Sequence, residues 1–337
     1  MEKFDKYSYS AANVYPIKVL LNEELVKHIR ETGKIPIIHV QLNPTNKCNF
    51  NCPYCSCKAR DRRLELSYED IMEIMAKAKK CGCQSTTVTG GGEPLMHPRI
   101  EEILDGIHEL DIEIGLVTNG TLLWSLSTST LNKMIWCRIS SSDYLEDQLE
   151  TIDSTLDDWL NVIEDAVERG KNVDWAFSHV VTEKPNFKIM KRIIEFANEH
   201  DFTHVRLVSD LLNLEKVPSM AIIKKKLRKL GVDDSRVNYQ ARKKFTRGTR
   251  NCYISILKPV ITPRGTIQPC CGVQYRLEKP TLDYDPDADM KYPAKQIDRL
   301  YEEQAFFDGS QCYRCYYSAY NEVLSILLRG VKHLRFV

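Results

Sequence analysis

The chain has 337 residues, of which 43% are hydrophobic and 28% charged, and its formal net charge of +1 indicates no particular class of partner. No apolar run approaches the roughly 20 residues that cross a bilayer, and the N-terminus lacks the basic-then-apolar pattern of a secretory signal. We therefore expect a globular, cytoplasmic protein with no membrane partner. In a reducing compartment, its twelve cysteines indicate thiolate ligands and buried thiols rather than disulfides.

Residues 1–35 are expected to form an N-terminal extension with one short helix. The helix covers Asn22–Glu31, with Asn22 as its N-cap, and it ends at Gly33. The first strand, Ile37–Leu42, follows directly. Its apolar side chains occupy alternate positions, and Pro36 stands just before it, where a missing N–H is tolerated.

From residue 36 to residue 215, strands and helices alternate. The further strands are expected at Ser85–Thr89, Ile112–Thr118, Met134–Ser140, Val173–Val181 and Val205–Val208. The helices are expected to begin at Ser67 and to cover Pro98–Leu110, Asp147–Arg169 and Asn186–Asn198. This alternation predicts an α/β fold with a parallel sheet and right-handed crossovers. Because six units are too few for an eight-stranded barrel, we expect an open or partial one, with functional groups at the C-terminal ends of its strands.

Three cysteines follow the first strand at C-x3-C-x2-C spacing, Cys48, Cys52 and Cys55. A 4Fe-4S cluster usually takes four thiolates, so three ligands leave one iron open for an exchangeable ligand. Two other interpretations are an incomplete zinc site and a chance grouping. Cys57 is an alternative third ligand.

A glycine-rich turn follows the second strand. Thr89-Gly90-Gly91-Gly92-Glu93-Pro94 places three glycines before a carboxylate, so the backbone can approach a ligand closely. Exposed amides beside a carboxylate suit a ligand that carries an ammonium group. A simple tight turn is the alternative.

These motifs together resemble those of the radical S-adenosylmethionine enzymes. The resemblance rests on the three cysteines with aromatic Tyr54 before the third, on Gly91-Gly92-Glu93-Pro94, and on Thr118-Asn119-Gly120 after the third strand. It implies a partial (β/α)6 TIM-like barrel over about residues 36–215. It also implies a 4Fe-4S cluster whose open iron binds S-adenosylmethionine, which is cleaved to a 5'-deoxyadenosyl radical that removes a hydrogen atom from a substrate.

The resemblance also assigns roles to individual residues. It makes Cys48, Cys52 and Cys55 the cluster ligands, and Gly91, Gly92 and Glu93 the holders of the cofactor's amino group. The remaining expected cofactor contacts are Tyr54, Asn119, Ser140 and Arg206. The segment Ile139-Ser140-Ser141-Ser142-Asp143 departs from the Ser-Leu-Asp-Gly of close relatives, so Ser140 could equally be a plain strand residue. His179 and Arg206 are expected to face the barrel interior in either a structural or a ligand-binding role.

Residues 216–250 are expected to form a basic helix, Met220–Leu230, and a linker. Residues 224–250 contain eleven Lys and Arg against two Asp. Such a stretch can attract nucleic acid, a phosphorylated substrate or an acidic peptide, although a solvated helix explains it equally well. The acidic run Asp283–Asp289 lacks the glycine and glutamate of a calcium-binding loop, so we expect it to be a solvated loop.

Residues 251–337 contain a second group of cysteines, Cys252, Cys270, Cys312 and Cys315. The segment Ile256–Ile267 predicts a β-hairpin that brings the first two together. Four thiolates can complete a cluster with no open iron, and spacing alone does not exclude a zinc ribbon. Cys271, beside Cys270, is an alternative ligand, a buried thiol or a hydrogen donor.

This second group is similar to the twitch or SPASM-like region of radical S-adenosylmethionine dehydrogenases and peptide maturases. The likeness implies an auxiliary 4Fe-4S cluster that accepts an electron. The expected reaction is an oxidative C–H modification, of the dehydrogenation type, of a small polyol or aminosugar-like molecule. A ribosomal peptide, or a nucleotide or nucleic acid held by residues 224–250, is the alternative substrate. We expect the reductant to be of the flavodoxin or ferredoxin type.

Overall fold

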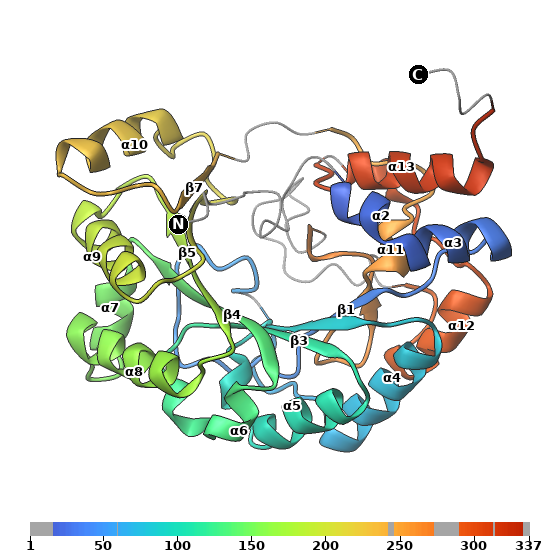
Figure 1. Cartoon of the computed structure of the whole chain (residues 1–337), viewed down its shortest axis with the longest axis horizontal. Coiled ribbons are helices and arrows are strands. Elements are labelled where there is room, and N and C mark those ends of the chain that lie inside the picture. The colour runs from blue at the N-terminus through green and yellow to red at the C-terminus, as the bar shows by residue number, and fades with distance from the viewer. Residues whose placement is uncertain (1–15, 59, 242–245, 273–289, 313, 333–337) are drawn as a thin grey trace.

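A nine-stranded sheet forms the centre of the protein in a computed structural model that describes residues 16–58, 60–241, 246–272, 290–312 and 314–332 (Figure 1). Its strand order is β7-β6-β5-β4-β3-β2-β1-β8-β9, and every pairing except β8 with β9 is parallel. The strands are β1 His39–Leu42, β2 Ser85–Val88, β3 Glu113–Thr118, β4 Met134–Ser142, β5 Asp174–Val181, β6 His204–Ser209, β7 Val237–Gln240, β8 Val260–Ile261 and β9 Ile267–Gln268.

Helices cover the outer face of the curved sheet. The described α-helices are α2 Ile17–Leu21, α3 Glu23–Thr32, α4 Tyr68–Lys80, α5 Ile100–Glu109, α6 Thr128–Leu131, α7 Leu145–Glu150, α8 Leu156–Arg169, α9 Phe187–Glu199, α10 Met220–Lys229, α11 Ile254–Leu257, α12 Ile297–Glu302 and α13 Ser318–Arg329. Those from α4 to α9 form an arc around the sheet (Figure 1). The predicted α/β fold, a partial TIM-like barrel, is confirmed.

Three of the predicted helix starts are confirmed by their caps. The side chains of Asn22, Ser67 and Asn186 accept hydrogen bonds from backbone N–H groups in the first turns of α3, α4 and α9. Gly33 ends α3 with a φ of 67°, a left-handed conformation that glycine adopts without strain.

Two sequence-based predictions were wrong in detail. The single helix expected over Asp147–Arg169 is broken into α7 and α8, with Asp153 at a φ of 51° between them. Thr155 and Asp158 form a capping box that starts α8 independently. The hairpin expected from Ile256 has instead a short helix, α11, at its start, and only the two-residue strands β8 and β9 pair.

Aromatic side chains fill the layer between the sheet and the helices. Phe177 on β5 stacks on Phe202 with ring centroids 4.8 Å apart, and Trp159 of α8 lies 5.8 Å from Phe177. All three are at most 1% exposed. Alternate residues of the same strands therefore point the other way, into the barrel.

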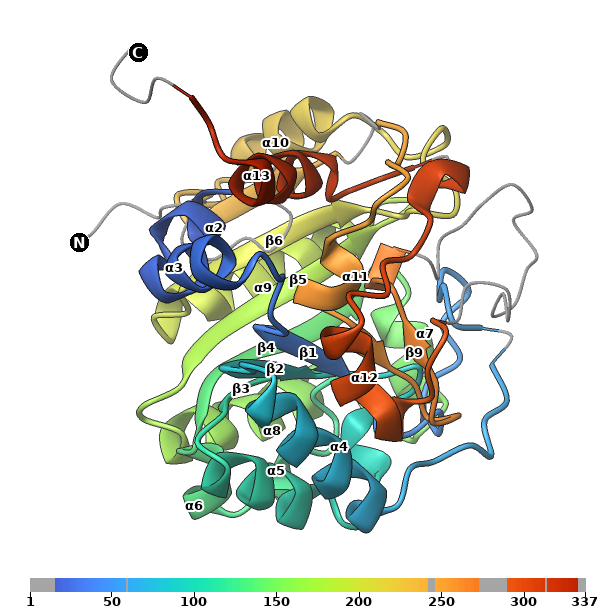
Figure 2. The ribbon, with the colours of Figure 1, turned by 90° about the vertical axis from the view of Figure 1, so that its right-hand side faces the viewer.

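The C-terminal part of the chain joins the barrel sheet directly. Strand β8 pairs with β1 through Gln41–Val260 and Leu42–Ile261. Helix α13 lies against the N-terminal helix α3 (Figure 2). Strand β7, not expected from the sequence, extends the other edge. The predicted domain boundaries at 35, 215 and 250 stay predictions.

None of the described helices is long and apolar enough to span a membrane. The expected loop Asp283–Asp289, and part of the basic stretch, residues 242–245, lie outside the described residues.

Candidate active site

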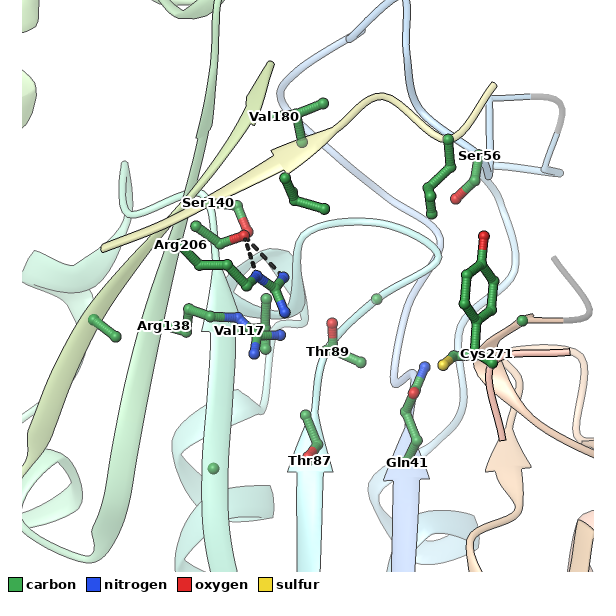
Figure 3. Close-up of a pocket in the computed structure, with 18 of the residues that line it drawn as sticks. Gln41, Ser56, Thr87, Thr89, Val117, Arg138, Ser140, Val180, Arg206 and Cys271 are labelled. Atoms are coloured by element: carbon green, nitrogen blue, oxygen red, sulfur yellow. Dashed lines mark hydrogen bonds between the residues drawn. The ribbon is translucent and has the colours of Figure 1, made fainter. Parts of the chain in front are cut away.

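A cavity of about 1500 Å³ lies on the inner side of the curved sheet. Figure 3 shows Gln41, Thr87, Val117 and Arg138 pointing into it from β1, β2, β3 and β4. Because cysteines from both groups line this cavity, it is the candidate active site.

The predicted ligands Cys48, Cys52 and Cys55 lie on the loop after β1, and all three are partly exposed to the cavity. The backbone N–H of Cys55 donates to the carbonyl oxygen of Cys52 at 3.1 Å, which closes a tight turn between them. Burial raises the pKa of the Cys48 thiol, and it raises the pKa of Cys52 to about 11. A metal that binds here must therefore displace protons, as it does in thiolate sites generally.

The side chain of Arg60 is hydrogen-bonded to this loop. Its guanidinium donates to the carbonyl oxygens of Asn46 at 2.8 Å and Cys57 at 2.7 Å, and to Cys55 Sγ at 3.5 Å. Cys57 also lines the cavity, and burial raises its pKa to about 12. The preference for Cys55 over Cys57 as a ligand therefore still depends on the spacing.

Asn119, expected to contact the cofactor, lies at the end of β3 and lines the cavity. Its side chain also anchors the cysteine loop, because Nδ2 donates to Asn49 Oδ1 at 2.7 Å while Oδ1 accepts from the N–H and hydroxyl of Thr121. Asn49 in turn donates to the Thr121 hydroxyl at 2.8 Å. The loop is thus fixed to the strand end by a closed set of three polar side chains.

The glycine turn presses against the start of the cysteine loop. An added Cβ at Gly91 would collide with Asn46 Oδ1, and one at Gly92 would collide with the carbonyl oxygen of Lys47. The N–H of Glu93 donates to the same Lys47 oxygen at 2.7 Å. Both glycines also line the cavity, and their expected close approach to a ligand stays a prediction.

Glu93 places a buried carboxylate at the cavity wall, 3% exposed. It accepts hydrogen bonds from the Thr118 hydroxyl at 2.7 Å, the Asn119 N–H at 2.7 Å and the Leu95 N–H at 3.1 Å. Burial raises its pKa to about 7 against the opposing effect of these donors. A carboxylate held this way can accept a further hydrogen bond from an amino group in the cavity.

Tyr54 and Ser140 also line the cavity, as expected of cofactor contacts. The ring of Tyr54 stacks on Tyr144, with centroids 6.5 Å apart. Strand β4 runs two residues beyond its predicted end, so Ser142 rather than Ser140 stands last in the strand. Ser142 also lines the cavity and was not among the expected residues. Because side chains alternate along a strand, Ser142 points to the same side as Ser140, and this spacing could have predicted its place.

Arg206 faces the cavity, as expected. Its Nε and Nη2 donate to the hydroxyl of Ser178 on β5 at 3.2 and 2.9 Å. Arg138 of β4, which the sequence analysis missed, points into the same space (Figure 3).

His179 does not face the barrel interior, and this expectation was wrong. It is completely buried on the helix side of β5, where Nδ1 lies 3.0 Å from Ser141 Oγ and Nε2 lies 3.0 Å from Asp143 Oδ1. Burial acts to raise the pKa of Asp143, but hydrogen bonds and attraction from His179, together with backbone donors at Thr182 and Asn186, leave it lower than usual. The group fastens the ends of β4 and β5 together.

Backbone hydrogen bonds hold the segments that carry two of the four predicted C-terminal ligands. Cys252 N–H donates to Phe307 O at 3.0 Å, and Cys315 N–H donates to Thr246 O at 2.8 Å. Burial, the largest cause, and the neighbouring Cys315 and Cys312 thiols together raise the pKa of Cys252 to about 12. Burial also raises the pKa of Cys270, with contributions from Cys271, Cys252 and Cys312.

Cys270 and Cys271 face different surroundings. Cys271 lines the cavity, and its Sγ lies 3.3 Å from the Tyr317 hydroxyl. Cys270 is not among the residues that line the cavity, and it lies close enough to Cys252 and Cys312 for their thiols to raise its pKa. This placement favours Cys270 as the fourth ligand.

Both predicted donor sets consist of cysteines, the ligand type that iron-sulfur clusters take. All twelve cysteines are free of disulfides, and Cys81, Cys83 and Cys137 are buried in the core. Among the side chains that the structure describes, no three of His, Cys, Asp or Glu stand close enough to hold a metal ion as they are. Ligation of either group stays a prediction.

The basic stretch is partly engaged within the protein. Arg228 and Lys224 pair with Asp234 at 3.0 and 3.7 Å, and Lys226 lies over the Phe187 ring at 4.1 Å. These contacts are typical of a folded helix surface.

The profile of the radical SAM superfamily matches residues 42–210, half of the chain. The chain therefore belongs to this superfamily of enzymes, which use a 4Fe-4S cluster and S-adenosylmethionine, as the resemblance predicted.

Individual proteins are also similar to this chain in sequence or in fold. The chain is 27% identical over 270 residues to a probable GTP 3',8-cyclase of Methanothermobacter thermautotrophicus, an alignment covering 72% of this chain and 87% of the relative. Its fold is similar to that of Streptococcus suis SuiB bound to S-adenosylmethionine, with a TM-score of 0.56, 17% identity, and coverage of 86% and 72% of the two chains. It is also similar to anSMEcpe with bound AdoMet, with a TM-score of 0.52, 16% identity, and coverage of 84% and 83%.

Proposed function

We propose that this radical SAM enzyme carries out an oxidative C–H modification of a small molecule held inside the barrel, between two iron-sulfur clusters. One observation carries the proposal: Cys48, Cys52 and Cys55 on one side, and Cys315 on the other, line one continuous cavity. A substrate in that cavity is within reach of a radical source and of an electron acceptor.

The first site would be built by the loop after β1 and the glycine turn. Cys48, Cys52 and Cys55 would hold a cluster that, with S-adenosylmethionine bound, supplies a 5'-deoxyadenosyl radical for hydrogen abstraction. Glu93 would accept a hydrogen bond from the cofactor's amino group. Tyr54, Asn119 and Ser140 are the further proposed contacts along the wall. Arg206, expected from the sequence to contact the cofactor, extends into the same part of the cavity as Arg138, so we assign it to the substrate below.

The second site would be built by Cys252, Cys270, Cys312 and Cys315. A cluster with four thiolates has no open iron, so it would supply electron transfer rather than substrate binding. Asn321 supports this site, because its amide lies 3.9 Å from Cys252 Sγ while its Oδ1 accepts from the Ile254 N–H at 3.1 Å. Hydrogen bonds to a sulfur ligand tune the potential of a cluster.

The substrate class proposed from the sequence is a small polyol or aminosugar-like molecule, and the reductant is of the flavodoxin or ferredoxin type. A second candidate is a cyclisation of a nucleotide, favoured by the likeness to a probable GTP 3',8-cyclase along 87% of that relative's length. Peptide modification is a third, since SuiB was also solved with a precursor peptide, but that likeness is one of fold.

The test begins with anaerobic reconstitution of the full chain. We expect about eight irons per chain, four for each cluster, and formation of 5'-deoxyadenosine from S-adenosylmethionine with dithionite. Deuterated candidate substrates, including GTP, are then screened for transfer of deuterium into 5'-deoxyadenosine. About four irons with tightly held zinc would rule out the auxiliary cluster, and no cofactor cleavage would overturn the proposal as a whole.

A further inference from the structure

The inside of the barrel gathers positive charge at the level where a substrate would lie. Arg138 on β4, Arg206 on β6 and Lys258, between α11 and β8, all line the cavity. Figure 3 shows the Arg138 and Arg206 side chains extending into the same part of it. Both lie near His204, since burial and the charges of the two arginines together lower the pKa of that histidine to about 3.

Lys258 belongs to the same group of charges. Burial lowers its pKa, and among its neighbours Arg138 lowers it further while Cys271 acts in the opposite direction. His39 on β1 has a pKa well below the usual value because of burial and of Lys258. Arg138 therefore lies near both Arg206 and Lys258. The two histidines beside these cations have lowered pKa values and add no positive charge near neutral pH.

Among the described residues, the carboxylates that line the cavity lie at other levels. Glu93 is fastened by its three donors at the end of β2, and Asp210, after β6, accepts from the Leu212 N–H and from Asn213 Nδ2, both at 2.9 Å. Glu113 and Asp174 stand at the opposite ends, as the first residues of β3 and β5. In the part of the lining that the structure describes, the charged side chains are thus basic in the middle of the barrel and acidic at both ends.

We propose that Arg138, Arg206 and Lys258 bind an anionic group, a phosphate or a carboxylate, of the substrate of the function proposed above. Like charges gathered in a partly desolvated space repel one another, and an anion among them relieves that cost. The guanidinium groups suit such a ligand because they can donate two parallel hydrogen bonds to a phosphate or carboxylate. Among the candidate substrates named above, the same charges favour a nucleotide over an aminosugar, whose ammonium group they would repel.

The depth of Arg138 indicates the substrate rather than the cofactor as the source of the anion. Arg138 lies four residues before Ser142, the last residue of β4, which corresponds to about 13 Å along a strand. The glycine turn and the cysteine loop, in contrast, lie beyond the ends of β2 and β1.

The test measures anion binding without requiring turnover. The reconstituted full chain, with S-adenosylmethionine bound, is titrated anaerobically by calorimetry at low ionic strength with inorganic phosphate, pyrophosphate and succinate. We expect at least one of these to bind with one site per chain, and Arg138→Gln and Lys258→Gln each to weaken that binding at least about tenfold. Preference for the phosphates over succinate, or the reverse, identifies the anion's class.

The control variant is Arg192→Gln, which removes an exposed cation paired with Asp157 on the outer helices and should leave anion binding unchanged. Arg138→Lys, which keeps the charge, should retain most of the binding and covers the case in which Arg138→Gln fails to fold. Absence of anion binding in the unaltered protein, or equal binding in all variants, overturns the proposal. A parallel loss of S-adenosylmethionine affinity in Arg138→Gln overturns it too, since the cations would then hold the cofactor's carboxylate. Intact anion binding without cofactor cleavage would instead refute only the proposed function.

Discussion

The buried carboxylate of Glu93 accepts a 2.7 Å hydrogen bond from the backbone N–H of Asn119, which ties the turn after β2 to the end of β3. Asn119 in turn donates to Asn49 in the cysteine loop. The proposed cofactor contact and the proposed cluster loop are therefore parts of one hydrogen-bonded unit.

Glu93→Gln should weaken S-adenosylmethionine binding by about tenfold, because the amide has one oxygen where the carboxylate has two and carries no charge. Since the pKa of Glu93 is about 7, the fraction of ionised carboxylate rises as the pH rises through 7. Cofactor affinity should accordingly increase between pH 6 and pH 7.5 in the unaltered protein and stay flat in the variant. Equilibrium dialysis of the reconstituted enzyme measures this, and parallel profiles in both proteins would contradict the role given to Glu93.

Cys52→Ala should abolish 5'-deoxyadenosine formation, whereas Cys315→Ala should retain some cofactor cleavage and form no finished product. Each variant should lose about half of the iron. Cys81→Ala, in the core at 6% exposure, is the matched control and should keep full iron content. If Cys315→Ala loses all cleavage along with its fold, the second site is needed mainly for folding.

Cys270→Ala should lose the auxiliary iron, and Cys271→Ala should keep it, because Cys270 lies near Cys252 and Cys312 while Cys271 faces the cavity. Iron analysis and electron paramagnetic resonance spectra of the reduced variants provide the measurement. The opposite pattern would show that the neighbouring thiol is the ligand.

Asp143→Asn should destabilise the fold by roughly 3 kcal/mol, because it breaks a buried pair with His179. A lowered thermal midpoint checks this, and 5'-deoxyadenosine formation per folded molecule should stay close to that of the unaltered protein. Since Asp143 keeps a lower pKa in the folded state than in the unfolded one, its stabilisation is present near neutral pH and is lost as the pH falls through the folded pKa. An unchanged midpoint would contradict a structural role.

The alternation of strands and helices was predictable because caps such as Ser67 and Asn186 act locally. Which residues of a strand point into the barrel was not predictable where both faces of the strand are buried. His179 and Ser178 are both buried, and of the two Ser178 faces the cavity. Arg138 was missed for the same reason. The pairing of β8 with β1 spans more than 200 residues of sequence and leaves no local signal in two residues.

In the candidate site, the cysteines and the glycine turn were predictable because each is a motif with a fixed spacing in the sequence. Ser142 and Arg138 were not, since their positions depend on where β4 ends and which way it faces. The choice between Cys270 and Cys271 likewise required the structure, because the orientation of neighbouring side chains on an irregular segment cannot be predicted from the sequence.

The sheet order also has a consequence for synthesis of the chain. Strand β1 carries the cysteine loop, and one of its two edges is covered only by β8, which is translated more than 200 residues later. A nascent chain that has completed the radical-generating half thus presents an unpaired backbone edge until Val260 and Ile261 emerge, and exposed edges invite pairing with other chains. Fragments that stop near residue 215 should accordingly aggregate during expression, although they contain every residue of the superfamily match.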